Sequence, residues 1–182
     1  MNRYLSLILL AAVFVLQGCA TTLTKGSDRR TQGAYIEDGS IEDTATERIK
    51  KKYEEKVHVN VSSYNRKVLV TGEVEDETVK NDITRIIGGV QNVTDIHNEL
   101  IIGPLANFSA RSGDALTTSN VKFRLRDSGK EFFRADQVKV VTEHDVVYLL
   151  GLVTHAEADV AKEIASTSRG VKKVVPFFEF VD

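Results

Sequence analysis

The single cysteine of the chain, Cys19, is the residue whose position points most clearly to a chemistry. It stands directly after Gly18, behind an apolar stretch from Leu5 to Leu16, and one positive residue, Arg3, precedes that stretch. A charged start, a short apolar core and a small residue at the end are typical of an export signal. The 12 residues of the stretch are too few to cross a bilayer, which needs roughly 20. The sequence therefore predicts a signal peptide over residues 1–18.

The run Leu16-Gln17-Gly18-Cys19 resembles the lipobox of bacterial lipoproteins. The resemblance implies that Cys19 is acylated, becomes the first mature residue and anchors the protein to a membrane outside the cytoplasm. Several acyl chains anchor stably where one chain is marginal. Ala20 stands where an Asp commonly signals inner-membrane retention in this class, which implies the outer membrane, with the protein facing the periplasm. The alternative is an ordinary secretory signal with a chance cysteine.

Size and charge limit what the mature chain can be. Removal of residues 1–18 leaves 182 − 18 = 164 residues, enough for one ordinary domain or two small ones. Because Arg3 leaves with the signal, 23 cations face 26 anions, and the formal charge is 23 − 26 = −3. That balance argues against a nucleic-acid partner. With no second cysteine for a disulfide, stability has to come from a packed core or from docking of two halves.

Side chains that could catalyse a reaction or hold a metal are scattered along the chain. The four histidines are His58, His97, His144 and His155. No two of them have the i, i+4 spacing of a helical metal site, so the sequence predicts neither a metal nor a cofactor. No Gly-x-Ser-x-Gly elbow is present, and the acidic run from Glu73 to Glu77 is typical of a solvated helix start. We therefore expect a protein that is not an enzyme.

The polar residues 19–42 are typical of a lipidated N-terminus followed by a flexible tether. Beyond them, hydrophobic spacing predicts an ordered series of elements. These are a helix opened by Asp43, strands over 57–61 and 68–74, a helix over 75–87 and a strand over 96–102. The same order then returns. It consists of a helix opened by Asp114, strands over 138–140 and 146–153, a helix over 156–168 and a strand over 174–181.

Two short motifs occur at matching places in both series. Gly72-x-Val74 corresponds to Gly151-x-Val153, and Gly89-Val90-x-x-Val93 corresponds to Gly170-Val171-x-x-Val174. A duplicated α-β-β-α-β unit explains this order. The sequence thus predicts an α+β fold of two tandem domains, 43–102 and 114–182, each with a small three-stranded sheet packed on helices. Residues 103–113, which include Pro104, form the linker.

These two motifs resemble the pattern of the BON domain, and behind a lipobox the pair resembles the dual-BON outer-membrane lipoproteins. The resemblance covers nearly the whole mature chain. It implies a periplasmic protein that supports outer-membrane integrity, binds anionic phospholipids such as phosphatidylglycerol and cardiolipin through its second BON domain, and gathers at the division site. A different function is also open, a protein-interaction adaptor for outer-membrane assembly or cell-wall factors, without lipid recognition beyond the acyl anchor.

The helix over 115–126 is our candidate for the lipid-binding surface. At 100° per residue, Val121 and Leu125 share one face, whereas Leu116 and Phe123 share nearly the opposite one. Exposed apolar side chains between cations are typical of a surface that enters a headgroup layer. The predicted phospholipid-binding residues are Leu116, Ser119, Asn120, Lys122, Phe123, Arg124 and Arg126.

The first copy serves as an internal control. If Ile49 and Tyr53 correspond to Val121 and Leu125, Thr44 and Lys51 stand at the places of the apolar pair. The first domain then has no apolar pair to insert. We therefore expect only the second domain to dock on lipid.

Alternatives remain for these apolar residues. The alternation over 121–126 also fits a plain strand, and Phe123 could pack against the other domain. Phe132 and Phe133, in the longer loop of the second copy, could meet the membrane or belong to the core. In the final strand, Val174, Pro176, Phe178 and Phe180 share one face, and Val175, Phe177 and Val181 share the other. Apolar residues on both faces predict that the other domain covers this strand, making the two domains a rigid pair.

Overall fold

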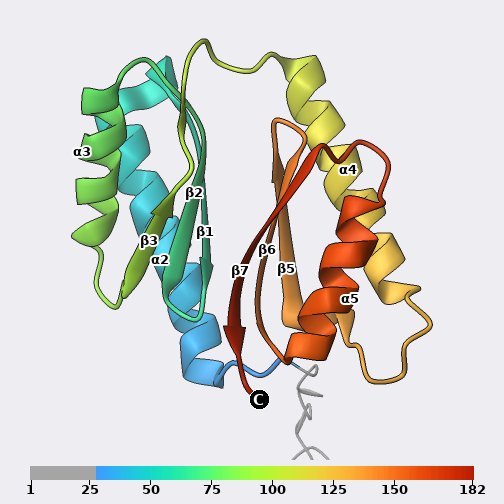
Figure 1. Cartoon of the computed structure of the whole chain (residues 1–182). Helices are drawn as coiled ribbons and strands as arrows, with labels where there is room; N and C mark the ends of the chain where they lie inside the picture. Colours follow the sequence, from blue (N-terminus) through green and yellow to red (C-terminus); the bar gives the residue numbers. More distant parts are fainter. Residues whose placement is uncertain (1–27) are drawn as a thin grey trace, which may run out of the picture.

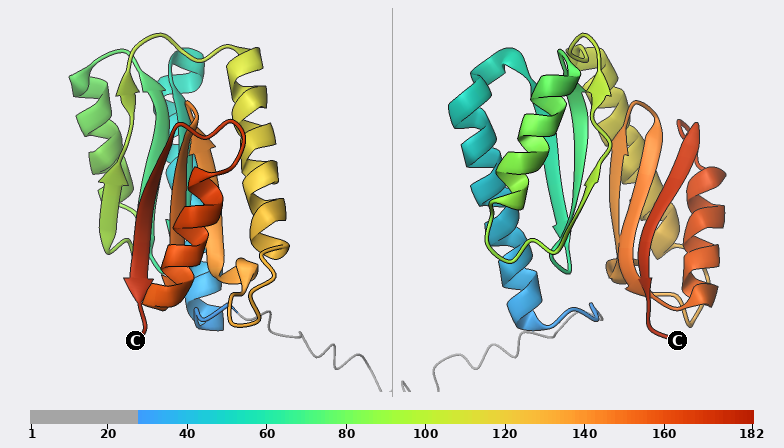
Figure 2. Two further views of the ribbon diagram at one scale, coloured as in Figure 1. Left: turned by 45° about the vertical axis from the view of Figure 1, so that its right-hand side comes forward. Right: turned by 60° about the vertical axis from the view of Figure 1, so that its left-hand side comes forward.

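The computed structural model describes residues 28–182, which fold into four layers: helices, sheet, sheet and helices (Figure 1). The helices form the outer layers and the two sheets lie face to face between them, as the turned views of Figure 2 also show. The first helix pair and sheet come from the first half of the chain, and the second pair and sheet from the second half. The predicted signal peptide and Cys19 fall in residues 1–27, outside the described residues.

Each half contains the predicted order of elements. The first domain consists of α2 (Gln32–Tyr53), η1 (Glu54–Lys56), β1 (His58–Tyr64), β2 (Lys67–Val74), α3 (Glu77–Gly88), β3 (Asp95–Asn98) and β4 (Ile101–Ile102). The second consists of α4 (Phe108–Arg126), η2 (Ala135–Gln137), β5 (Val138–Glu143), β6 (Val146–Val153), α5 (His155–Ser166) and β7 (Lys173–Phe180). The predicted α+β class and duplicated unit are confirmed.

Both sheets mix antiparallel and parallel pairing in the same way. β1 pairs antiparallel with β2, and β3 and β4 both run parallel to β2. β5 likewise pairs antiparallel with β6, and β7 runs parallel to β6. The two hairpins turn through residues with positive φ, Asn65-Arg66 in the first domain and His144-Asp145 in the second. Two-residue turns of this kind match the right-handed twist of the strands they join.

The first helix of each domain begins earlier than the sequence predicted. α2 starts at Gln32, where the Thr31 side chain caps it by accepting a hydrogen bond from the Ala34 N–H. Ala34 and Ile41 are buried, so the predicted flexible tether is wrong over residues 32–42. α4 starts at Phe108 after an Asn107 cap, so the second half of the predicted linker is helical. Both segments are helical although they contain few apolar residues, because each helix buries only a narrow stripe of side chains.

Four of the five buried residues of α2 correspond to the four buried residues of α4. The buried residues shared by position are Asp38, Ile41, Ala45 and Ile49 in α2, and Asp114, Thr117, Val121 and Leu125 in α4. Each member of the second set lies 76 positions after its counterpart (114 − 38 = 76). Leu125 therefore corresponds to Ile49, and the expected match of Leu125 with Tyr53 was one helical turn out of register. Ser40 and Glu47, both exposed, stand at the places of Leu116 and Phe123.

The repeated Gly-x-Val motif has a steric cause. A Cβ at Gly72 would lie 2.0 Å from the backbone oxygen of His58 on the neighbouring strand. A Cβ at Gly151 would lie 2.5 Å from the backbone oxygen of Gln137. Gly72 also has a φ of 120°, which L side chains rarely adopt. Only glycine lets the two strands of each hairpin approach this closely.

The two sheets pack against each other through a third hydrophobic cluster. Tyr64 and Leu69 of the first domain contact Tyr148 and Leu150 of the second in this cluster. Val175 and Phe177 of β7 join it, while Val174 and Phe178 pack against the helices of their own domain. The prediction that the other domain covers the final strand is confirmed. Partial burial of β7 on both sides explains why it carries apolar residues on both faces.

The start of the described chain contacts both domains, since Arg30 Nη1 donates to Asp38 of the first domain (2.8 Å) and Arg29 reaches the second. Arg29 Nη1 donates hydrogen bonds to Glu157 (2.6 Å) and to the Leu152 carbonyl (3.0 Å). Burial alone would raise the pKa of Glu157, but the hydrogen bonds from Arg29 and Thr154 hold it below its usual value.

No helix among residues 28–182 is both long enough and apolar enough to span a bilayer.

Candidate functional site

Helix α4 has two unlike faces. Its inner face buries Val121 and Leu125, which are 0% and 1% exposed, in the core of the second domain. Its outer face leaves Leu116 73% exposed and Phe123 67% exposed. The predicted helix and its core face are confirmed, and the plain-strand reading is wrong. Because Phe123 is exposed, it does not pack against the first domain.

The remaining polar residues of the predicted set divide by what they contact. Arg124 is half-buried, and its Nη1 donates to the Ile164 carbonyl (2.9 Å) and to Ser168 Oγ (2.7 Å) at the end of α5. Asn120 Nδ2 donates to the Arg169 carbonyl at 3.4 Å, in the same region. These contacts make Arg124 and Asn120 a link between the two helices. Ser119 is exposed, and its Oγ donates to the backbone of its own helix.

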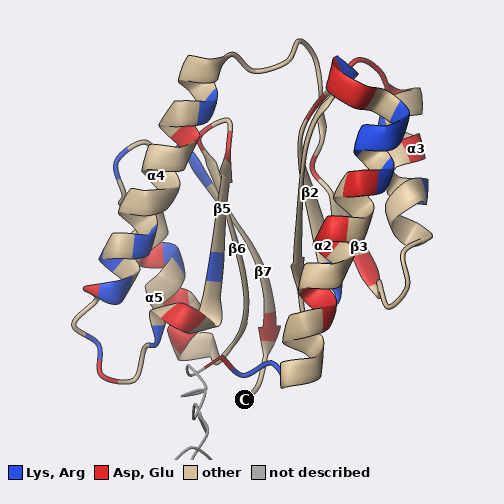
Figure 3. Ribbon diagram, turned by 180° about the vertical axis from the view of Figure 1, so that it is seen from behind, with Lys and Arg blue, Asp and Glu red and all other residues tan. Residues whose placement is uncertain are grey.

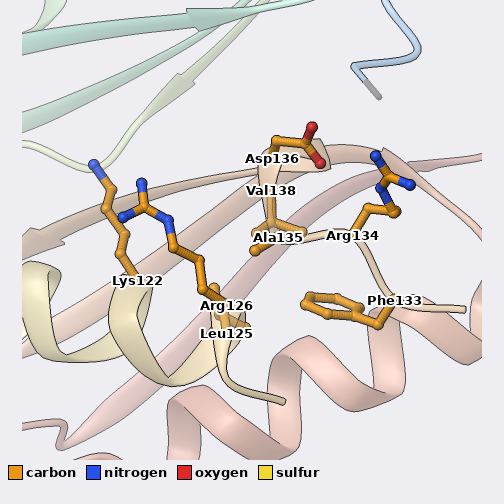
Figure 4. Close-up of a pocket in the computed structure, with 8 residues that line it drawn as sticks. All are labelled: Lys122, Leu125, Arg126, Phe133, Arg134, Ala135, Asp136 and Val138. Carbon is orange, nitrogen blue, oxygen red and sulfur yellow. The ribbon is translucent and has the colours of Figure 1, made fainter. Parts of the chain in front are cut away.

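Lys122 and Arg126 are exposed and line a pocket of about 440 Å³ at the C-terminal end of α4. They extend side by side from the helix, whereas Arg134 lines the opposite side of the pocket, beyond Asp136 and Val138 (Figure 4). The apolar part of the lining is Leu125, Phe133, Ala135 and Val138, and the acidic part is Asp136. A pocket with three cations and an apolar base can accept an anionic group that carries a hydrocarbon part.

Charge distinguishes α4 from α2 over their whole lengths. α4 carries four cations and one anion, a net +3, whereas α2 carries four cations and five anions, a net −1. In the view from behind, Lys and Arg gather on the C-terminal half of α4, whereas on α2 acidic residues precede the cations of the C-terminal end (Figure 3). The helix that exposes the apolar pair therefore has a net positive charge in a protein whose net charge is negative.

The two aromatic residues of the loop after α4 differ in exposure, and two further residues near the site, Phe108 and Arg134, were not among those predicted from the sequence. Phe133 is buried in the core of the second domain, whereas Phe132 is 54% exposed. Phe108 is 82% exposed on the first turn of α4, and at 100° per residue it falls within a quarter turn of Leu116. It was missed because the helix was expected to begin at Asp114, although Asn107 is a recognisable capping residue. Arg134 was missed because only folding brings its loop beside α4.

The pocket lies near the point where the described chain begins. Tyr64 Oη donates to Asp28 (3.3 Å) and to the Gln137 carbonyl (3.2 Å), and Gln137 lies between the pocket residues Asp136 and Val138. Figure 1 shows the start of the described chain and the C-terminal end of α4 at the same end of the molecule. An attachment at the N-terminus would therefore also keep this surface near the point of attachment.

Comparison with known proteins gives a consistent family. The BON domain matches residues 38–104 and 113–182. The chain is 36% identical to the outer membrane lipoprotein DolP of Haemophilus influenzae, over 96% of this chain and 95% of that protein. It is 31% identical to a 21 kDa hemolysin of Actinobacillus pleuropneumoniae, over 87% and 81%. It is 30% identical to the osmotically-inducible protein Y of Escherichia coli, over 64% and 58%.

The two family matches coincide with the two structural units, and a relative of nearly equal length is an outer membrane lipoprotein. The chain therefore belongs to the BON-domain family and is an outer-membrane lipoprotein built from two such domains.

Proposed function

We propose that this protein is a non-enzymatic, lipid-anchored component of the envelope that binds anionic phospholipid through helix α4 of its second domain. The observation that carries the proposal is the outer face of α4, where Leu116 and Phe123 are exposed beside cations. An apolar side chain gains free energy on entering the acyl boundary, and each nearby cation contributes about 1 kcal/mol on an anionic surface.

The pocket beside this face gives the headgroup a place to bind. When Phe123 enters the bilayer, Lys122 and Arg126 on the flank of the helix lie at headgroup depth. Together with Arg134, they can donate several charge-assisted hydrogen bonds to a phosphate. Phosphatidylglycerol and cardiolipin, which carry net negative charge, fit this pocket better than a zwitterionic lipid.

The position of the N-terminus supports the same orientation. If the acyl anchor is on Cys19, few residues separate it from Asp28, and Asp28 lies near the pocket. An anchored protein would therefore hold α4 close to the bilayer at high effective concentration. We further propose, from family resemblance alone, that the protein faces the periplasm, supports outer-membrane integrity and gathers at the division site.

A second function has an observation in its favour, a protein-interaction adaptor. Ile101 and Ile102 of β4 are 44% and 49% exposed, and Leu105 beside them is 44% exposed. A short strand with exposed apolar side chains can accept a partner, such as an outer-membrane assembly protein. Both functions can coexist because this patch lies on the first domain.

Co-sedimentation with vesicles tests the lipid-binding proposal. Residues 20–182 without the anchor suit this test, since all three hydrophobic clusters form within the described chain. We expect binding to vesicles that contain phosphatidylglycerol or cardiolipin, weakening as salt rises, and little binding to phosphatidylcholine. Replacing Leu116 and Phe123 together by Ser should weaken binding about tenfold or more.

The matched control removes another exposed apolar pair, from the other domain, Ile101→Ser with Ile102→Ser. This variant should bind vesicles like the wild type. Equal losses in the two double variants, or none in either, would contradict a lipid surface on α4. Capture of an outer-membrane protein that the Ile101/Ile102 variant loses would support the adaptor function.

A further inference from the structure

Four ionisable side chains meet between the two sheets, where the domains dock. His58 and Glu73 come from β1 and β2, whereas Glu143 ends β5 and His144 begins the turn after it. His58 Nδ1 lies 2.9 Å from Glu73 Oε2 and 4.0 Å from Glu143 Oε1. His144 Nε2 contacts Glu73 Oε1. Each domain thus supplies one imidazole and one carboxylate to the same place.

Glu73 is an ionised carboxylate at the centre of this cluster. It is 1% exposed, and within residues 28–182 its polar contacts are the two imidazoles and the backbone N–H of Ala106. Burial alone would raise its pKa, but the Ala106 N–H and the imidazoles hold the pKa below its usual value. No Lys or Arg is among these contacts, so the charge of Glu73 is not balanced by a permanent cation.

Glu143 is held with one oxygen turned toward His58. It is 3% exposed, and its Oε2 accepts hydrogen bonds from Asn60 Nδ2 (2.8 Å) and Thr71 Oγ1 (3.1 Å). Its other oxygen, Oε1, is the one that lies 4.0 Å from His58 Nδ1. Hydrogen bonds that orient a carboxylate in this way are typical of the surroundings of metal ligands.

The spacing of the donor atoms fits one small ion. Atoms that bind a tetrahedral zinc ion at 2.0–2.2 Å lie about 3.4 Å from one another. The separations of 2.9 Å and 4.0 Å bracket this value, and the donor atoms of His58, Glu73 and Glu143 all lie within 4.8 Å of one another. A divalent ion with neutral imidazoles would also balance the two buried carboxylate charges.

A path to the cluster exists beside β1. A pocket of about 400 Å³ is lined by His58 and Asn60, and by Leu105 and Arg111 from the linker and α4. An ion can reach His58 through this pocket without separation of the two sheets.

We propose that His58, Glu73 and Glu143 bind a divalent transition-metal ion, and that this ion locks the two domains together. Imidazole nitrogens and carboxylate oxygens suit zinc. Because both domains supply ligands, the ion binds the docked arrangement and not the separated one, and so stabilises it. This site is distinct from the α4 surface and does not depend on lipid binding.

Metal binding can be measured on the full chain, purified in detergent without a histidine tag and stripped with chelator. Titration calorimetry should show one zinc ion per chain. At about 100-fold excess over its Kd, zinc should raise the Tm by about 5–10 °C. Co²⁺ in place of zinc should give the absorption bands of a four-coordinate nitrogen and oxygen site. Absence of saturable zinc binding by the wild type would overturn the proposal.

Glu143→Gln separates metal binding from folding. It removes one of two neighbouring buried charges, so the Tm without metal should stay the same or rise, while the zinc-dependent rise should disappear. The matched control is His155→Gln, which alters an exposed histidine paired with Asp182 far from the cluster and should keep the full rise. A zinc-dependent rise that persists in Glu143→Gln would contradict the assignment.

Discussion

Helices α2 and α4 occupy the same place in two copies of one fold. Their buried inner faces are alike, whereas their exposed outer faces differ. On the inner face, buried residues correspond at a constant spacing, and each helix contributes a buried Asp to the hairpin turn of its domain. Asp38 accepts from the backbone N–H groups of Asn65 and Arg66, and Asp114 accepts from those of His144 and Asp145.

On the outer face the two helices differ. Ser40 and Glu47 of α2 stand where α4 has Leu116 and Phe123, and α2 has a net charge of −1 against +3 for α4. The inner face is constrained by packing against its sheet, whereas the outer face of each copy is free to change. The duplicated fold therefore keeps its core and hairpin contacts while one copy acquires a surface with a different function.

The largest effect should come from the motif that both copies retain. Gly72→Ala should lower the free energy of unfolding by about 3–5 kcal/mol, because the new Cβ meets a backbone carbonyl and the residue has a positive φ. Gly151→Ala should cost less, since its contact is longer. Urea titration of both variants measures the difference. Equal losses would show that the positive φ of Gly72 has no energetic weight.

The buried Asp of the first domain should matter more than that of the second. Asp38 accepts hydrogen bonds from Arg30, Ser63 and the two turn amides, whereas Asp114 accepts from the turn amides. Asp38→Ala should therefore cost about 3 kcal/mol, and Asp114→Ala about 1–2 kcal/mol. Thermal unfolding of the two variants checks this order, and a larger loss in Asp114→Ala would reverse the comparison.

The charge difference of the outer faces predicts a smaller effect, on vesicle binding. Lys122→Gln with Arg126→Gln removes two cations from α4 and should weaken binding to anionic vesicles by about 2 kcal/mol, or about 30-fold. Lys50→Gln with Lys51→Gln makes the same change of net charge on α2, where both residues are exposed. This control should bind within a few-fold of the wild type. Similar losses in the two double variants would mean that total charge, and not α4, attracts the lipid.

The sequence predicted the duplicated fold because its signals are local. The Gly-x-Val motif requires a close approach within one hairpin, and Val121 and Leu125 share a face of one helix. The early starts of α2 and α4 were missed because Thr31 and Asn107 precede segments with few apolar residues.

The sites depend on tertiary structure and were less accessible. Arg134 joins Lys122 and Arg126 only after the loop folds back beside α4. Spacing along the chain gave no sign of the proposed metal site, since His58 and Glu143 are 143 − 58 = 85 residues apart and come together only when the domains dock. Hydrophobic periodicity predicts elements and cores, whereas contacts between domains follow from how the elements assemble.

The smallest predicted effect concerns the attachment of the N-terminal segment to the second domain, and it depends on pH. The pKa of Glu157 is lowered in the folded protein, where Arg29 donates to it. In the unfolded protein the pKa of a Glu side chain is near 4.3. Because the pKa of Glu157 is lower in the folded protein, the ionised carboxylate stabilises the fold above about pH 4.3. This stabilisation is lost as the pH falls through the pKa of the folded protein. Arg29→Gln should therefore cost about 1 kcal/mol at pH 6, and the difference from wild type should vanish toward pH 3. Lys162→Gln removes the partner that lowers the pKa of Asp159, but both side chains are exposed, so this variant should change the pH dependence less than Arg29→Gln does. A difference between Arg29→Gln and wild type that stays constant from pH 6 to pH 3 would show that Arg29 acts through its hydrogen bond to the Leu152 carbonyl instead.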